Sequence, residues 1–210
     1  FPTGRKASSA PSAPPFGRRA WIELDRSALC HNVNYLKKLL PAGCRLMPAV
    51  KANAYGHGAV LISRELNRLG IDAFCVACAA EGVILRKHGV TGEILILGYT
   101  HPSQFPLLNR FRLTQTVVDA SYGALLNASG RDFHVHVGID TGMRRLGEPC
   151  ENLDGLSGLW KLKHLRIDGV FSHLCTADGQ TDREEAYVKK QISAFQSAVR
   201  RLEARGCPCP

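Results

Sequence analysis

Aromatic residues and dense basic blocks are both scarce in this chain. Phe, Trp and Tyr make up 7% of its 210 residues, and its 27 lysines and arginines are spread along the sequence. A nucleic-acid surface usually concentrates basic residues on one face or along one helix. We therefore expect no nucleic-acid partner, and we interpret the net charge of +9 as solvated helix faces that also attract anionic small molecules.

Long apolar runs are missing as well. No stretch approaches the roughly 20 residues that a membrane-spanning helix needs, and no apolar signal-peptide core lies near the start of the sequence. From these absences we expect a cytoplasmic location. The sequence begins at Phe1 and ends at Pro210 directly after a helical pattern, which we interpret as a portion of a longer protein.

Metal-ligand spacing is also absent. Cys75 and Cys78 form a lone C-x-x-C pair, with no second pair and no histidine at zinc spacing. The pair lies in the apolar run AFCVACAA, which is typical of buried free thiols in a reducing compartment. We therefore expect no metal site and no disulfide framework.

The sequence does contain a regular alternation of short apolar strands and helices. Residues 1–19, rich in Pro, Ala and Ser, are predicted to be a flexible linker, and residues 20–210 a folded domain. A short strand is predicted at 21–24, and the main strands at 46–50, 73–77, 94–97, 113–118, 133–139 and 165–171. Helices are predicted from Asp25 or Ser27 to Leu40, and at 58–69, 79–88, 102–110, 120–128, 148–160 and 183–205. This alternation predicts an α/β fold with a parallel sheet covered on both faces.

A (β/α)8 barrel and an open doubly wound sheet both fit this alternation. No G-x-G-x-x-G or phosphate-loop signature follows the first main strand. The chemically interesting residues instead follow the ends of several strands, where barrel enzymes build their active sites. We therefore predict a TIM-type (β/α)8 barrel that is incomplete here, with about six strand–helix units and the closing strands after residue 210. Pro48 is out of place in a central strand, because it removes a hydrogen-bond donor.

The run VKANAYGHG, residues 50–58, places Lys51 at the end of the first main strand. A lysine that attacks an aldehyde must be neutral, and burial at the mouth of an apolar strand favours the neutral form. The glycine-rich loop that follows leads into a helix N-terminus, which attracts anions, and Tyr55 adds a hydroxyl. Composition alone leaves a surface lysine in a turn as the alternative.

Two further motifs follow the fifth and sixth main strands. GIDTGMRRLG, residues 138–147, combines an acid, a small flexible turn and two arginines; arginine there suits a carboxylate or a phenolate, and a solvated charged turn is the alternative. In FSHLCTADG, residues 171–179, His173 could stack on a flat cofactor, act as a base or be a core histidine. A metal-dependent barrel hydrolase using His134, His136 and His173 stays open, although His134 and His136 lack a clear third ligand.

Four segments together resemble the alanine racemase family, in that family's order and approximate spacing. They are AWIELDRSALCHNVNYLKKLLP, MPAVKANAYGHG, HVGIDTGMRRLG and FSHLCTAD. The resemblance extends over residues 20–210, and AVKANAYGHG is highly specific. It implies a (β/α)8 barrel followed by a β-rich C-terminal domain, which is missing here, together with pyridoxal 5′-phosphate as cofactor and a homodimer acting on a small amino acid.

The resemblance also implies a role for individual residues. Lys51 binds the cofactor covalently and is one of two bases that move the α-proton. Tyr55 helps to hold the phosphate, and His173 lies against the pyridine ring. Arg145 orients the substrate and the opposing tyrosine base, and Met143 offers its backbone N–H to the substrate carboxylate. The opposing tyrosine, the arginine at the pyridine nitrogen and much of the phosphate cup belong to later residues. Residues 1–210 alone are therefore expected to be inactive.

Two positions depart from the family pattern. Gly138 stands where many members have a lysine, often carbamylated, that supports the arginine matching Arg145, and Arg144 replaces a residue that is often glycine. The implied function is interconversion of L- and D-alanine for peptidoglycan. A serine racemase of the glycopeptide-resistance type, which follows a membrane domain, is the alternative, and the proline-rich start is compatible with it. A non-catalytic pyridoxal-phosphate carrier is disfavoured, because such proteins lack the DTGM-x-RLG pattern.

Overall fold

The computed structural model describes residues 21–210. The predicted linker at 1–19 lies outside the described residues. The helices are α1 Arg26–Leu39, α2 Lys51–Tyr55, α3 Ala59–Arg68, α4 Ala79–Lys87, η1 Pro102–Gln104, α5 Phe105–Arg110, α6 Ala120–Ala128, α7 Leu153–Leu159 and α8 Asp182–Glu203. The strands are β1 Ala73–Val76, β2 Glu93–Ile96, β3 Thr114–Val117, β4 Phe133–Asp140, β5 Glu148–Pro149 and β6 Leu165–Phe171. None of the helices described over residues 21–210 is long and apolar enough to cross a membrane.

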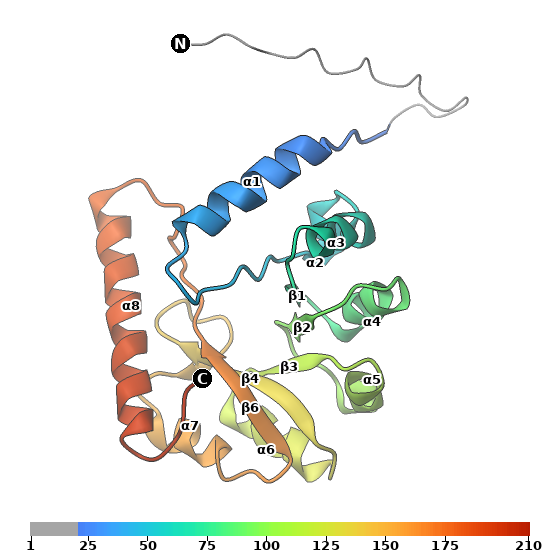
Figure 1. The fold of residues 1–210 in the computed structure, drawn as a ribbon. Helices are drawn as coiled ribbons and strands as arrows, with labels where there is room; N and C mark the ends of the chain where they lie inside the picture. Colours follow the sequence, from blue (N-terminus) through green and yellow to red (C-terminus); the bar gives the residue numbers. More distant parts are fainter. Residues whose placement is uncertain (1–20) are drawn as a thin grey trace.

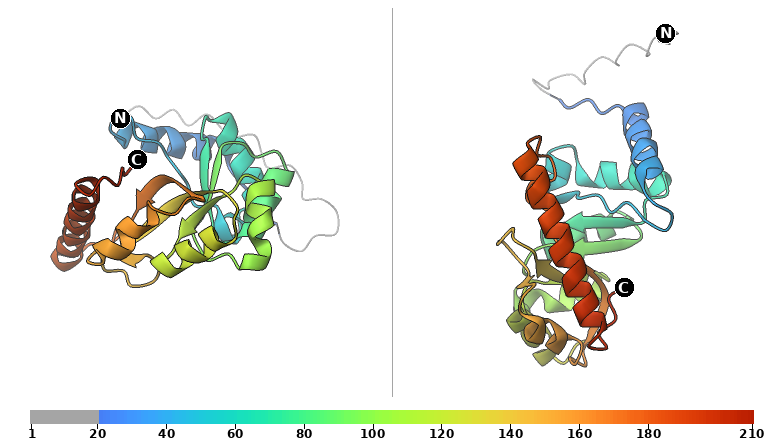
Figure 2. Two further views of the ribbon diagram at one scale, coloured as in Figure 1. Left: turned by 90° about the horizontal axis from the view of Figure 1, so that it is seen from below. Right: turned by 90° about the vertical axis from the view of Figure 1, so that its left-hand side faces the viewer.

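All the strand pairings are parallel, and, apart from the two-residue β5, neighbouring strands follow one another along the chain. β1 pairs with β2, β2 with β3, β3 with β4 and β4 with β6, while the two-residue β5 pairs with the end of β4. A doubly wound sheet would reverse its strand order. Figure 1 shows the helices in a ring around the strands, and Figure 2 shows α1 and α8 as separate rods on the outside of the sheet. The barrel-type α/β fold predicted from the sequence is confirmed.

Alternate strand residues pack outward against the helices. Phe74, Ile94, Val117 and Val135 are buried with helix residues in one continuous core. Each such side chain contributes about 1.5–3 kcal/mol of hydrophobic stabilisation. The opposite face of the sheet carries the smaller or more polar residues, and this face lines the cavity described below.

The first main strand is much shorter than predicted. Only Ala49 pairs with β1, in an isolated bridge to Cys75. The Pro48 carbonyl accepts a hydrogen bond from Cys75 N at 2.9 Å, and Val50 N donates to the Cys75 carbonyl at 2.8 Å. Pro48 has no N–H to extend this ladder, which accounts for the short pairing. The prediction of a strand at 21–24 is wrong, because those residues form no strand.

Two predicted helices also differ from the structure. The helix predicted at 148–160 begins at Leu153, because Glu148 and Pro149 pair with the end of β4 and the Asn152 side chain caps the helix by accepting from Gly155 N. The helix predicted at 102–110 is divided into a 3-10 turn and α5. The remaining elements lie within a few residues of their predicted bounds, and Asp25 rather than Ser27 is the N-cap of α1.

Candidate functional site

A cavity of about 270 Å³ lies at the carboxyl ends of the strands. Most of its lining comes from strand ends and from the loops that follow them: Lys51, Ala77, Leu97, Gly98, Thr116, Gly138, Ile139, Asp140, Met143, Arg145, Leu146, Gly147, Phe171, Ser172 and His173. Four residues predicted for the site, Lys51, Met143, Arg145 and His173, are therefore brought to one cavity from three separate loops. This is the edge at which barrel enzymes place their chemistry.

Lys51 begins a turn of unusual handedness. The next four residues, Ala52 to Tyr55, all have φ between +49° and +56°, so the five-residue α2 winds left-handed after its first residue. Left-handed helix costs L-residues about 1–2 kcal/mol each, so the surroundings must hold it. Ala54 N donates to the Val50 carbonyl at 2.9 Å, and Asn53 Oδ1 accepts from Ala59 N at 2.8 Å. The turn fixes the chain directly beside Lys51.

Glu81, in the first turn of α4, supports this turn from outside. Its Oε1 accepts from Ala52 N and its Oε2 accepts from Ala77 N, both at 2.7 Å. One carboxylate thereby joins the residue after Lys51 to the end of β1. Sequence reasoning missed Glu81, since an acidic residue in a first helical turn ordinarily reads as favourable to the helix dipole.

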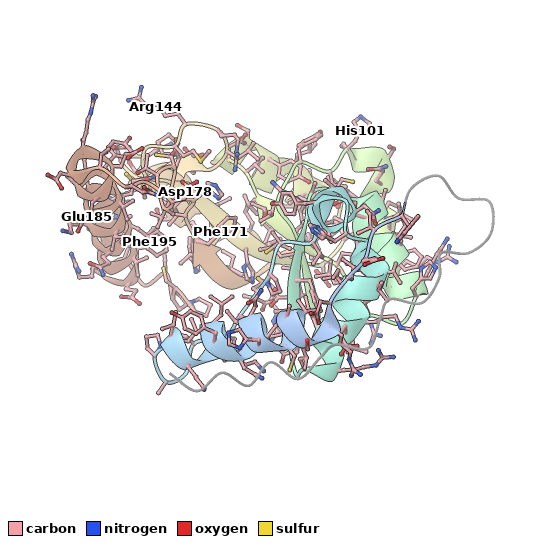
Figure 3. All side chains as sticks on the ribbon, turned by 90° about the horizontal axis from the view of Figure 1, so that it is seen from above. His101, Arg144, Phe171, Asp178, Glu185 and Phe195 are labelled. Atoms are coloured by element: carbon pink, nitrogen blue, oxygen red, sulfur yellow. The ribbon has the colours of Figure 1, made fainter. Side chains whose placement is uncertain are left out.

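The loop after β4 is shaped by Asp140. Its carboxylate accepts from Gly142 N at 2.9 Å and from Arg144 N at 3.0 Å, a local turn that short acidic side chains favour. Arg144 has φ of +57° and lies at the edge of the molecule, pointing away from it (Figure 3). Arg145 instead lines the cavity. The two adjacent arginines therefore have different surroundings, which the sequence did not distinguish.

His173 follows β6 and lines the cavity, although much of its surface is exposed. Burial lowers the pKa of its imidazole below the ordinary 6.5, and the charges of Arg145 and Lys51 act in the same direction. The lowered pKa favours the neutral form of the ring. A neutral ring suits contact with a flat molecule or acceptance of a proton better than it suits binding an anion.

Tyr55 does not line the cavity. Its side chain is 62% exposed, at the end of the left-handed turn, so its predicted contact with a phosphate stays a prediction. His57 lies elsewhere too: its Nδ1 is 2.8 Å from the Ala54 carbonyl, and it lines an apolar groove beside α1.

The histidines of β4 are engaged by carboxylates. His134 pairs with Asp168, and His136 Nε2 lies 3.0 Å from Glu93 Oε1. Over residues 21–210, no group of three or more His, Cys, Asp or Glu side chains is placed to hold a metal ion. All eight cysteines are free thiols, and burial raises the pKa of Cys75 to about 11, which keeps it protonated and unreactive at neutral pH.

Gly138 and Thr116 share one wall of the cavity. A Cβ added at Gly138 would meet no atom closer than 3.5 Å, so the backbone leaves room for a side chain there. Thr116 is 1% exposed and its Oγ1 has no hydrogen-bond partner. A buried hydroxyl without a partner costs about 1–3 kcal/mol. This hydroxyl is therefore buried behind the cavity wall without a partner among the described residues.

Comparison with known proteins bears on this site. Residues 24–210 match the family model described as alanine racemase, N-terminal domain. The chain is 42% identical to an amino-acid racemase of Enterococcus faecalis over 91% of its length and 27% of the relative's. It is 38% identical to an alanine racemase of Geobacter sp. (strain M21), over 88% of the chain and 51% of that protein.

Two further similarities complete the comparison. A serine/alanine racemase of Enterococcus gallinarum is 36% identical over 90% of the chain and 27% of that protein. The solved alanine racemase of Clostridium difficile 630 superposes with a TM-score of 0.80 at 32% identity, over 88% of this chain and 52% of that one. The chain thus spans between about a quarter and a half of the length of these proteins.

Proposed function

The chain belongs to the alanine racemase family through that family's N-terminal domain, and we propose that the full-length protein is a pyridoxal 5′-phosphate-dependent amino-acid racemase. The observation that carries the proposal is the convergence of Lys51, Arg145 and His173 on one cavity at the carboxyl edge of a barrel-type sheet. These side chains come from three loops widely separated in sequence, so a shared cavity is a stronger signal than any one motif.

The residues present fit pyridoxal 5′-phosphate. The cavity is close in size to the lower end of small-molecule sites, about 300–1,000 Å³, and most of its lining is apolar, which suits an aromatic ring. Lys51, which lines the cavity, supplies the amine for the aldehyde. When bound, the cofactor withdraws electrons from the substrate's α-carbon and makes its proton removable.

The chain's own residues bind and orient the cofactor and substrate and move the proton. Lys51 Nζ holds the cofactor and, once released, accepts or returns the α-proton on one face of the substrate. Arg145 presents a planar, permanently charged fork that pairs with a carboxylate or phenolate oxygen. His173 would contact the cofactor's ring from the cavity wall. Met143 offers its backbone N–H to the substrate carboxylate, and Tyr55 contributes to holding the phosphate.

Racemisation needs proton transfer on both faces of a planar carbon, and Lys51 serves one face. The family resemblance assigns the other face to a tyrosine in the C-terminal domain of a partner subunit. A homodimer of the full-length protein is therefore part of the proposal. Residues 1–210 alone should not racemise an amino acid, because one of the two proton-transfer groups is absent.

Alanine is the proposed substrate. The product, D-alanine, would be used for peptidoglycan. Serine is the second candidate, because the matched proteins include a serine/alanine racemase as well as alanine racemases. A hydrophobic pocket rejects an added hydroxyl only weakly, and the cavity lining includes the polar residues Asp140 and Ser172.

The experiment that tests the proposal is a racemisation assay. The full-length protein, loaded with pyridoxal 5′-phosphate, is supplied with L-alanine and L-serine in parallel, and the D-enantiomers are measured by chiral chromatography. We expect D-alanine to form faster. Faster formation of D-serine would mean that serine, not alanine, is the preferred substrate. If neither L-amino acid gave its D-enantiomer, the proposed activity would be contradicted.

A further inference from the structure

Gln191 is a fully buried polar side chain in the middle of α8, with 0% of its surface exposed. Its Oε1 accepts from Cys175 N at 3.1 Å. Its Nε2 donates to the His173 carbonyl at 3.1 Å and to Thr141 Oγ1 at 3.3 Å. Every one of these partners lies outside its own helix, so the amide does not serve α8 itself.

The partners belong to the two loops that carry Arg145 and His173. Thr141 lies in the loop after β4, four residues before Arg145, and its Oγ1 is 2.7 Å from Ser172 Oγ in the loop after β6. One turn earlier in α8, Tyr187 donates its hydroxyl to the Gly142 carbonyl at 3.0 Å. The helix therefore reaches the backbone of both loops.

Gln191 contacts the two loops at a point where no strand pairing connects them. The pairing of β4 with β6 ends at Gly138 and Phe171, and both cavity loops begin beyond that point. A buried amide is costly unless all its groups are satisfied, and a leucine would fill a similar volume at lower cost. The amide at this site therefore has a purpose other than packing.

We propose that Gln191 is a positioning residue that fixes the His173 loop and the Arg145 loop relative to each other. The proposal rests on the proposed function for what those two side chains do. Lys51 lies on a third loop that Gln191 does not touch. Loss of the amide should therefore weaken the binding of cofactor and substrate more than it slows proton transfer by Lys51.

The test uses the full-length protein and three variants. Gln191→Leu removes every hydrogen bond of the amide, including the one that its Oε1 accepts from Cys175 Sγ. Thr141→Val removes the Thr141 hydroxyl with little change in side-chain shape. Gln196→Leu changes an exposed glutamine of the same helix and is the matched control. Three quantities are measured: the thermal midpoint, the Kd of pyridoxal 5′-phosphate from an absorbance titration, and kcat and KM for the substrate that the wild type turns over.

We expect Gln191→Leu to raise the cofactor Kd and the substrate KM about tenfold, with a smaller change in kcat, because the buried groups that the amide satisfied are left unpaired. Thr141→Val should raise the same KM about threefold, and Gln196→Leu should leave all three quantities unchanged. If Gln191→Leu does not fold, Thr141→Val alone decides, and an unchanged KM there overturns the proposal.

The outcomes separate this inference from the function it rests on. A lower thermal midpoint in Gln191→Leu with wild-type Kd and KM means that the residue is only structural, and overturns its positioning role. Absence of cofactor binding and of turnover in the wild type and in Gln196→Leu overturns the proposed function, and this role with it.

Discussion

Glu81 Oε1 lies 2.7 Å from the backbone nitrogen of Ala52, the residue that follows Lys51. Its other oxygen is bonded to the end of β1, so this carboxylate anchors the left-handed turn to the sheet. The turn carries four successive residues with positive φ, a conformation that persists only when neighbouring groups over-determine it. The direction of Lys51 therefore depends on a glutamate that belongs to another helix.

Replacement of Glu81 by glutamine should loosen the turn. An amide keeps one acceptor but turns an NH2 group toward a backbone N–H, so one hydrogen bond is lost and a donor is left unpaired. We expect the full-length variant to bind pyridoxal 5′-phosphate about tenfold more weakly, from a cost of about 1–3 kcal/mol. An absorbance titration measures it.

Glu65→Gln is the matched control for Glu81. Glu65 on α3 pairs with Arg26 and Arg68, away from the cavity. The control should lower the unfolding midpoint slightly and leave the cofactor Kd unchanged. Equal Kd values in both variants would show that Glu81 supports the fold and not the lysine turn.

Arg145 and Arg144 are adjacent in sequence, and substitutions of each test whether Arg145 alone binds the substrate. Arg145→Lys keeps the charge but loses the planar fork that pairs with a carboxylate through two hydrogen bonds. We expect the KM for the amino acid to rise about tenfold or more, since one charge-assisted hydrogen bond contributes about 1.5–3 kcal/mol. Arg144→Lys should leave the KM unchanged, because this side chain points away from the molecule. A larger effect at Arg144 would contradict the assignment.

The lowered pKa of His173 predicts a pH-dependent stability. In the unfolded chain the ring gains a proton as the pH falls through the ordinary 6.5, whereas in the folded protein burial, Arg145 and Lys51 delay that gain. The unfolded state then binds more protons, so folding stability declines below about pH 6.5 until the folded ring titrates as well.

The measurement for His173 is urea unfolding of the full-length protein and of His173→Gln between pH 7.5 and pH 5. We expect the wild type to lose more stability than the variant over this range, because glutamine has no proton to gain. The comparison isolates the histidine from the other titrating groups. An equal loss in both proteins would show that the ring is not protected from protonation.

Gly92 and Gly89 lie before β2, at the end of the strands opposite the cavity, and they test a steric demand there. Both have positive φ, but a Cβ at Gly92 would lie 2.0 Å from the Asp72 carbonyl oxygen, whereas one at Gly89 meets nothing within 4 Å. Backbone strain costs about 1–2 kcal/mol at either position, and overlap adds about 1–3 kcal/mol.

We therefore expect Gly92→Ala to destabilise the protein by roughly 2–5 kcal/mol and Gly89→Ala by about 1–2 kcal/mol. Denaturant unfolding measures both. Equal losses would mean that the chain shifts freely around Asp72 and that the close approach of the two backbones has no energetic consequence.

The alternation of strands and helices was predictable from the sequence because each element has its own hydrophobic period. The placement of Lys51 and His173 at strand ends followed from that alternation, and their approach to Arg145 from the common edge of a parallel sheet. The reduced pairing around Pro48 was signalled by the missing N–H but was not predicted as a single bridge.

Other parts of the site have no local signal. Ala52 and Ala54 adopt positive φ, although alanine favours right-handed helix, so the left-handed turn arises from tertiary hydrogen bonds. Glu81 and Gln191 lie on helices whose sequences are ordinary. The partner of Glu81 beside Lys51 is 29 residues away, and the partners of Gln191 are at least 16 residues away. Only the folded arrangement shows that these two side chains serve the cavity loops.

The central claim, that Lys51 anchors the cofactor, has one direct test. The full-length protein is incubated with pyridoxal 5′-phosphate, reduced with borohydride and digested, and the peptides are mapped by mass spectrometry. We expect the added pyridoxyl phosphate mass on the peptide at Lys51, and its loss in Lys51→Arg. Modification of a different lysine, or none in the wild-type protein, would contradict the account.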